Sequence, residues 1–166
     1  MLCMTQIAHQ QVCSHPEQHV HDSRSLLAEV ANVCRERGVR LTPLRLQVLS
    51  LIAGSKTPVK AYELIELMRD THGPTAPPTV YRALDFLLEN GFIHKLESIA
   101  AFVGCHHPRQ SHSVPFLICN RCQVAVELED EEVTRLLAQR AAALGFRPQA
   151  QTLEVHGICA RCSKAE

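Results

Sequence analysis

The chain has 166 residues, a length that suits one large domain or two small ones. Seventeen Lys and Arg balance seventeen Asp and Glu, so the net charge of the whole chain indicates no particular partner. With 46% hydrophobic and 20% charged residues, the composition excludes a disordered or fibrous protein. The unusual feature is an excess of metal-ligand residues, eight Cys and ten His.

Two features of the sequence bear on the compartment. No apolar run approaches the roughly 18 residues that a membrane span requires. The first 21 residues lack the cationic start and apolar core of a secretory signal. We therefore expect a cytoplasmic protein with no membrane partner, in which thiols serve more readily as metal ligands than as disulfides.

Apolar periodicity predicts three helices after an N-terminal segment that has little of it. The first helix covers residues 23–37, and the second begins at Pro43 after an N-capping Thr42 and is apolar nearly all round. The third covers 61–70. Its inward side chains are expected to be Leu64, Ile65, Leu67 and Met68.

A fourth helix and a hairpin complete the first half of the chain. The helix covers 78–89, and the hairpin strands cover 92–97 and 101–105. The apolar stripe of the helix consists of Val80, Leu84, Leu87 and Leu88. Arg82 projects from the opposite, polar face, where Thr79, Asp85 and Phe86 flank it. Three helices, an exposed fourth and a hairpin predict a winged helix-turn-helix.

The charge of the first half differs from that of the whole chain. Seven Lys and Arg face only two Glu between residues 24 and 60, a net charge of +5. A solvated basic surface would have the same composition, but a recognition-type helix follows this segment. We therefore expect it to track a phosphate backbone.

The second half predicts a small α/β unit. Strands are expected over 115–119, 124–128 and 152–158, and an amphipathic helix over 131–144. Three short strands and one helix leave an apolar face uncovered, which indicates a partner subunit.

Two CxxC pairs carry the strongest chemical signal in the sequence: Cys119, Cys122, Cys159 and Cys162. Four thiolates at this spacing suit a closed tetrahedral Zn²⁺ site that staples the last strand to the start of the second domain. A thioredoxin-like redox site would instead have one pair opening a helix in a βαβ unit. A more scattered set of donors is His94, Cys105, His112 and Glu127, which spacing alone does not select.

Four segments resemble the ferric uptake regulator family of bacterial metal-responsive transcription factors, most closely its zinc uptake regulator branch: VRLTPLRLQVL, PPTVYRALDFLLENGFIHKLES, ICNRC and HGICARC. The resemblance covers about residues 23–163. It implies an α+β homodimer, with an N-terminal winged helix-turn-helix and a small C-terminal α/β dimerisation domain. It also implies Zn²⁺ as cofactor, and repression of zinc-uptake genes when zinc is plentiful.

The resemblance also implies domain boundaries and residue roles. It divides the chain into a tail (1–22), a DNA-binding domain (23–105), a hinge (106–113) and a dimerisation and zinc-binding domain (114–166). The four CxxC cysteines correspond to a structural zinc site. The four scattered donors, His94, Cys105, His112 and Glu127, correspond to a regulatory zinc site, which makes two sites per monomer. Tyr62, Thr79 and Arg82 are the expected DNA contacts.

The expected mechanism joins the two halves of the chain. His94 and Cys105 belong to the DNA-binding domain or its exit, whereas His112 and Glu127 lie beyond the hinge or at it. One zinc ion would tie the domains together and set two recognition helices for a palindromic operator on double-stranded DNA. His106 and His107 adjoin Cys105 and could replace His112 or, with His156, form a further site.

Three other functions remain open at the level of sequence. An iron- or peroxide-sensing member of the family is one, although the iron-sensing HHDH pattern is absent here and the Cys105 thiolate favours Zn²⁺. A zinc-stabilised interaction module without DNA binding is another. A zinc enzyme is the third, but the HExxH pattern is absent and neither Cys pair follows a Pro as in zinc deaminases.

Overall fold

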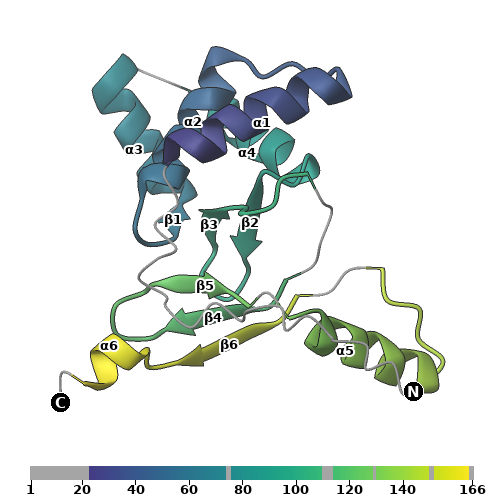
Figure 1. Cartoon of the computed structure of the whole chain (residues 1–166). Coiled ribbons are helices and arrows are strands. Elements are labelled where there is room, and N and C mark those ends of the chain that lie inside the picture. Colours follow the sequence, from purple (N-terminus) through teal and green to yellow (C-terminus); the bar gives the residue numbers. More distant parts are fainter. Residues whose placement is uncertain (1–22, 74–75, 110–113, 129, 150–151, 165–166) are drawn as a thin grey trace, which may run out of the picture.

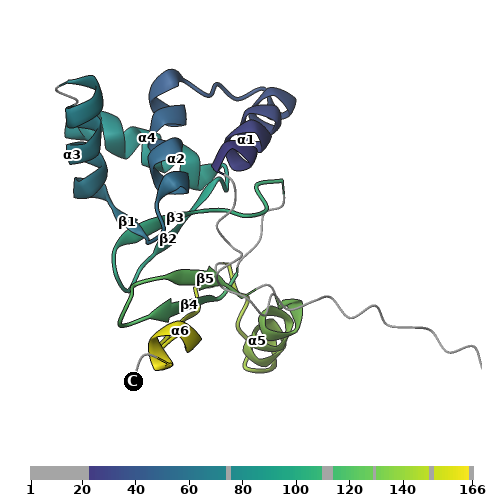
Figure 2. The same cartoon turned by 60° about the vertical axis from the view of Figure 1, so that its left-hand side comes forward.

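The computed structural model describes residues 23–73, 76–109, 114–128, 130–149 and 152–164, so the predicted tail and His112 lie outside the described residues. Figure 1 shows two tiers, with α1 to α4 and β1 to β3 forming one and β4 to β6 with α5 and α6 forming the other, and Figure 2 shows the same division. The elements are α1 (Ser23–Arg37), α2 (Pro43–Gly54), β1 (Val59–Lys60), α3 (Ala61–His72), α4 (Pro77–Glu89), β2 (Ile93–Leu96), β3 (Ala101–Gly104), β4 (Phe116–Cys119), β5 (Ala125–Glu127), α5 (Glu131–Ala143), β6 (Glu154–Gly157) and α6 (Ala160–Ser163).

Local sequence explains where the helices of the first tier begin and end. The Thr42 side chain accepts a hydrogen bond from the Arg45 N–H, and Pro43 occupies the first turn of α2, as predicted. At the end of α4, the Phe92 N–H donates to the Leu87 carbonyl at 2.9 Å, across Gly91 with φ +71°. This 6→1 closure turns the chain directly from α4 into β2.

The first tier has a core built from all four helices and its small sheet. The strands run in the order β1-β3-β2, all antiparallel. The largest fully buried core side chains include Val30 and Val33 of α1, Val48 and Leu49 of α2, Leu64 and Met68 of α3, Leu84 and Leu87 of α4, Ile93 of β2, and Phe92 between α4 and β2. Each such side chain contributes roughly 1.5–3 kcal/mol by leaving water, so this tier has its own hydrophobic core.

Three expectations about the first tier need correction. Leu67 is 43% exposed instead of inward, because Leu64 and Met68 already form the buried stripe of α3. On α4, Leu88 is only partly buried, and Ala83 takes a buried position. Phe86 is not part of a polar face, because it packs against the core and the Arg45 guanidinium covers its ring at 3.6 Å.

The second sheet has two different faces. Its order is β5-β4-β6, with β4 antiparallel to β5 and parallel to β6. One paired row consists of Glu127, Phe116 and Glu154, and the next consists of Val126, Leu117 and Val155. Successive rows point to opposite faces. Phe116 is buried, whereas Leu117 and Val155 are 41% and 48% exposed.

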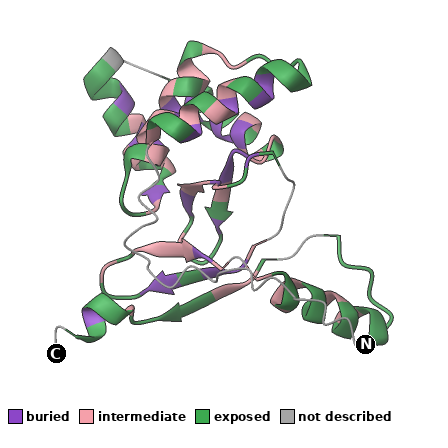
Figure 3. Cartoon of the chain, viewed as in Figure 1, coloured by how far each residue is buried: buried purple, intermediate pink, exposed green. Residues whose placement is uncertain are grey.

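The helix α5 lies beside the second sheet without burying any of its residues (Figure 3). Leu136 and Leu137 are about half exposed, and Leu144 and Phe146 after the helix are more exposed still. The apolar side chains of α5 and those of the outer sheet face are therefore both exposed in the single chain. None of the helices in the described ranges has the length and apolarity that a bilayer crossing requires.

Candidate metal centres

The four CxxC cysteines converge at one end of the second sheet. Cys119 ends β4, Cys122 follows in a tight turn, and Cys159 and Cys162 bracket the start of α6. Their sulfur atoms all lie within 4.8 Å of one another, and the Sγ atoms of Cys122 and Cys159 are 3.7 Å apart. A four-thiolate shell of this size suits a tetrahedral Zn²⁺ ion, which has Zn–S bonds of about 2.3 Å.

The surroundings of these thiols lower the pKa of Cys119 and Cys122 and raise that of Cys162. Backbone N–H donors from Cys122 and then Cys159 lower the pKa of the Cys119 thiol to about 6. Burial raises the pKa of the Cys162 thiol to about 12. A metal bound here must therefore displace at least the Cys162 proton, which makes its binding dependent on pH.

A second group of donors lies between the tiers and includes His94, Cys105 and Glu127. Strand β2 carries His94, and β5 ends at Glu127. Cys105 directly follows β3, and its N–H donates to the Phe92 carbonyl at 3.0 Å, which continues the hairpin ladder by one residue. The chain can approach α1 closely just before Cys105, because a Cβ on Gly104 would lie 2.9 Å from a Leu26 methyl.

The chemistry of this second group fits a metal ion. One ligand atom from each of His94, Cys105 and Glu127 lies within 4.8 Å of the others. The Glu127 carboxylate is only 5% exposed, and its Oε1 lies 3.4 Å from His94 Nε2. A buried carboxylate requires compensating positive charge, which a cation supplies. Burial, followed by the Glu127 charge, raises the pKa of the Cys105 thiol to about 12.

The remaining histidines differ in their relation to this group. His106 Nδ1 lies 3.8 Å from Glu127 Oε2, so His106 borders the cluster from the side of Cys105. His107 is exposed. His156 lies elsewhere, with its Nε2 2.9 Å from the Ser98 hydroxyl. The expected fourth ligand, His112, lies outside the described residues.

Comparison with known proteins identifies the family. The model of the ferric uptake regulator family matches residues 36–164. The chain belongs to the ferric uptake regulator family. The zinc uptake regulation protein of Escherichia coli K12 is 42% identical over 145 residues, which make up 87% of this chain and 85% of that protein.

Solved structures of the family show the same fold. Holo XcZur is 62% identical, with a TM-score of 0.79, covering 84% of this chain and 98% of its own. A zinc uptake regulator complexed with zinc and DNA is 42% identical, with a TM-score of 0.82, covering 87% of this chain and 97% of its own. Apo XcZur, at the same 62% identity, gives 0.52 and covers 86% and 98%. At equal identity, the whole chain therefore matches the holo structure better than the apo structure.

The predicted DNA contacts of this ferric uptake regulator family member all lie on the surface of the first tier. Tyr62, in the first turn of α3, is 56% exposed. Thr79 and Arg82 are exposed on α4. Tyr81, between them, is 49% exposed and was not predicted as a contact. The outward, N-terminal part of α4 thus presents hydrogen-bonding side chains to solvent.

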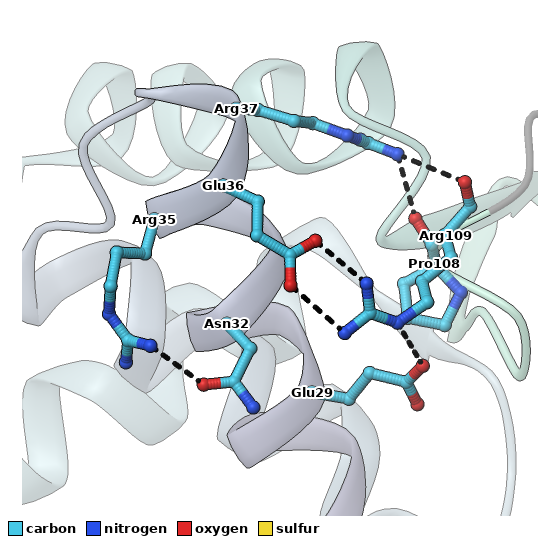
Figure 4. A network of polar contacts seen from close by, with 7 residues as sticks. All are labelled: Glu29, Asn32, Arg35, Glu36, Arg37, Pro108 and Arg109. Atoms are coloured by element: carbon cyan, nitrogen blue, oxygen red, sulfur yellow. Dashed lines mark hydrogen bonds and ion pairs between the residues drawn. The ribbon is translucent and has the colours of Figure 1, made fainter.

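A polar network ties the segment after Cys105 to α1 (Figure 4). The Arg109 guanidinium donates to both oxygens of Glu36, at 2.7 and 3.3 Å, and its Nε lies 3.4 Å from Glu29. Arg37 donates to the carbonyls of Asn90 at 2.8 Å and Pro108 at 3.0 Å. These contacts fix the direction in which the chain leaves the first tier. The sequence does not predict them, since only the fold brings residue 109 back to α1.

Proposed function

We propose that this chain is a zinc-responsive, DNA-binding transcriptional repressor that represses zinc-uptake genes when zinc is plentiful. The observation that carries the proposal is the cluster of His94, Cys105 and Glu127, because its members come from both tiers. Membership of the ferric uptake regulator family and the likeness to a zinc uptake regulator complexed with zinc and DNA support the same function. We also propose a cytoplasmic location, because a DNA-binding repressor must be in the compartment that contains the DNA.

The regulatory centre in this proposal consists of His94, Cys105, His112 and Glu127. Zn²⁺ bound there would supply a positively charged, tetrahedral link between the domains. In this proposal the DNA-binding domain (23–105) supplies the ligands His94 and Cys105, and the dimerisation domain (114–166) supplies Glu127. The two domains lie on either side of the hinge (106–113). Joining them lowers the entropic cost of setting two recognition helices at the spacing that an operator needs. By linkage, DNA must strengthen zinc binding equally.

The structural centre in this proposal consists of the four CxxC cysteines. Because all four ligand positions are protein thiols, no position remains for an activated water. Its role is to hold α6 and β6 against β4, and folding of the dimerisation domain depends on it. A regulatory centre filled by four protein ligands would likewise leave no open position, which disfavours a zinc enzyme.

The proposed DNA interface is the exposed face of α4 with the start of α3. Arg82 is the proposed base reader, as a bidentate donor to guanine, and Thr79 and Tyr62 are proposed to contact bases or phosphates nearby. The basic residues between 24 and 60 supply the phosphate contacts that make binding dependent on salt.

The proposed partner subunit is a second copy of the chain. The outer row of the second sheet, with Leu117 and Val155, and the apolar side of α5, with Leu136 and Leu137, are exposed in the single chain. An apolar surface of this kind marks an interaction site. A twofold dimer would cover it and place two copies of α4 on a palindromic operator.

Metal content and operator binding together test the function. We expect two zinc ions per chain, one of which a mild chelator removes, and we expect this removal to abolish binding to promoter DNA of zinc-uptake genes. A gel shift with zinc and with chelator measures the second effect. A single zinc that resists chelation, with DNA binding indifferent to zinc, would instead favour a zinc-stabilised interaction module. Restoration by Fe²⁺ but not Zn²⁺ would favour an iron sensor.

A further inference from the structure

The Glu154 carboxylate of the second sheet binds the turn between β2 and β3 of the first tier, which we call the wing turn. Glu154 on β6 accepts hydrogen bonds from the backbone N–H groups of Glu97 at 2.7 Å and Ser98 at 3.1 Å, and from the Ser98 hydroxyl. These donors belong to the turn between β2 and β3. Neither candidate metal centre includes Glu154.

The position of Glu154 in the sheet relates it to the candidate regulatory centre. Phe116 on β4 pairs with Glu127 on one side and with Glu154 on the other. Directly paired residues point to the same face, so both carboxylates face the first tier. Glu127 approaches His94 on β2, whereas Glu154 binds the turn that begins where β2 ends. One row of the sheet therefore holds the wing at two points.

His156 extends this second contact to the cysteine cluster. Its Nε2 lies 2.9 Å from the Ser98 hydroxyl, and its Nδ1 lies 3.3 Å from the Asn120 side-chain oxygen. Asn120 directly follows Cys119, so the wing turn is joined to the structural centre as well.

The environment of Glu154 favours its charged form. Burial alone would raise its pKa, but the hydrogen bonds from Ser98 and Glu97 outweigh that effect and lower it. Hydrogen bonds to a carboxylate are roughly twice as strong as those between neutral groups. Glu97 and Ser98 are exposed residues in a turn, so Glu154 is what shields their amide protons.

We propose that Glu154, which belongs to neither metal centre, is a clasp: a positioning residue that docks the wing turn on the second sheet and thereby raises the zinc affinity of the regulatory centre. This inference rests on the proposed function. The apparent affinity of a site decreases when a smaller fraction of the molecules has the site assembled. Releasing the wing turn lets β2 and His94 move away from Glu127, so zinc binding weakens although every ligand is intact.

The test compares Glu154→Ala with Glu97→Gln in the full-length protein. Glu97→Gln removes one negative charge from the same turn, where that side chain contacts Lys95 and not Glu154. Chelator competition measures the zinc dissociation constant of the regulatory centre, and hydrogen exchange measures protection of the Glu97 and Ser98 amides. For Glu154→Ala we expect zinc binding to weaken about 5-fold or more, loss of amide protection, and retention of the structural zinc. Glu97→Gln should change none of these.

Two results would contradict the proposed role of Glu154 as a clasp. Unchanged zinc affinity despite loss of amide protection would show that the turn is not coupled to the regulatory centre, and unchanged protection would show that Glu154 does not hold the turn. If Glu154→Ala is poorly folded, Glu154→Gln keeps one acceptor oxygen and should give an intermediate loss of affinity. Neither readout uses DNA, so wild-type DNA binding that ignores zinc would contradict only the proposed function. A wild type with no second zinc would contradict both.

Discussion

Cys105 is the single residue whose chemistry is most informative about the regulatory centre. Its side chain is fully buried, and the raised pKa of about 12 keeps its thiol protonated at neutral pH in the absence of metal. Metals bind the thiolate, so binding must release this proton. The same burial that opposes ionisation also keeps the thiol away from oxidants in solution.

This release gives the regulatory zinc affinity a definite pH dependence. Between about pH 7 and 9 the Cys105 thiol stays protonated without metal, so each unit of rising pH should increase the affinity about 10-fold. Titration calorimetry in two buffers of different ionisation enthalpy counts the released protons. Affinity that stays constant over this range would mean that Cys105 is not a zinc ligand.

Arg82 provides a prediction on the DNA side. Arg82→Ala should cost about 1–3 kcal/mol of specific operator binding, because a bidentate contact to guanine is lost, and should leave the dimer intact. Arg135→Ala, on α5, is the matched control and should have no effect. An equal loss on random DNA would instead identify Arg82 as a phosphate contact.

Sequence predicted some of these residues and could not predict others. The spacing of the CxxC pairs identified the four cysteines that the structure brings together. His94, Cys105 and Glu127 are widely separated in the chain, so only family resemblance selected them. Glu154 and Arg109 were missed because their partners, Ser98 and Glu36, are distant in sequence and are ordinary polar residues.

At the scale of elements, strong local signals gave accurate predictions. The Thr42 and Pro43 cap fixed the start of α2, and periodicity gave α1 with the bounds observed. The two-residue β1 and the four-residue α6 were missed because such short elements have no period of their own, and tertiary contacts form them. The prediction that Leu67 points inward was wrong, because α3 fully buries only Leu64 and Met68 among its apolar side chains.

The exposed face of α5 leads to a prediction about assembly. Leu137 is 46% exposed in the single chain, so Leu137→Glu should place a charge in the proposed dimer interface and favour the monomer. Gln139→Glu, an exposed change on the same helix, is the control. Light scattering after gel filtration measures the mass. A Leu137→Glu dimer that persists at micromolar concentration would contradict the role of this face.

At the scale of the whole molecule, two tiers meet through a small number of polar groups. The cluster of His94, Cys105 and Glu127 forms one connection, and Glu154 with the wing turn forms another. The small apolar cluster of Leu96, Phe116 and Ile118 packs beside them. An interface of this kind permits domain motion unless a ligand stabilises it. The TM-score is 0.79 with holo XcZur and 0.52 with apo XcZur, so the whole chain matches the holo structure better.

The overall architecture was predictable because local patterns and family resemblance pointed to the same answer. The winged helix-turn-helix and the small α/β domain are both present, and the α+β fold class is confirmed. Periodicity could not predict how the two tiers are placed relative to each other. That placement depends on contacts between residues far apart in the sequence, such as Glu127 and His94.

Operator binding as a function of free zinc, compared between the wild type and Cys105→Ser, tests the proposed mechanism most directly. The wild type should bind the operator much more tightly as free zinc rises. Cys105→Ser should remain a folded dimer with one zinc per chain, held by the four CxxC cysteines, and should bind DNA weakly at every zinc concentration. Normal zinc-dependent operator binding by Cys105→Ser would contradict the assignment of the regulatory centre.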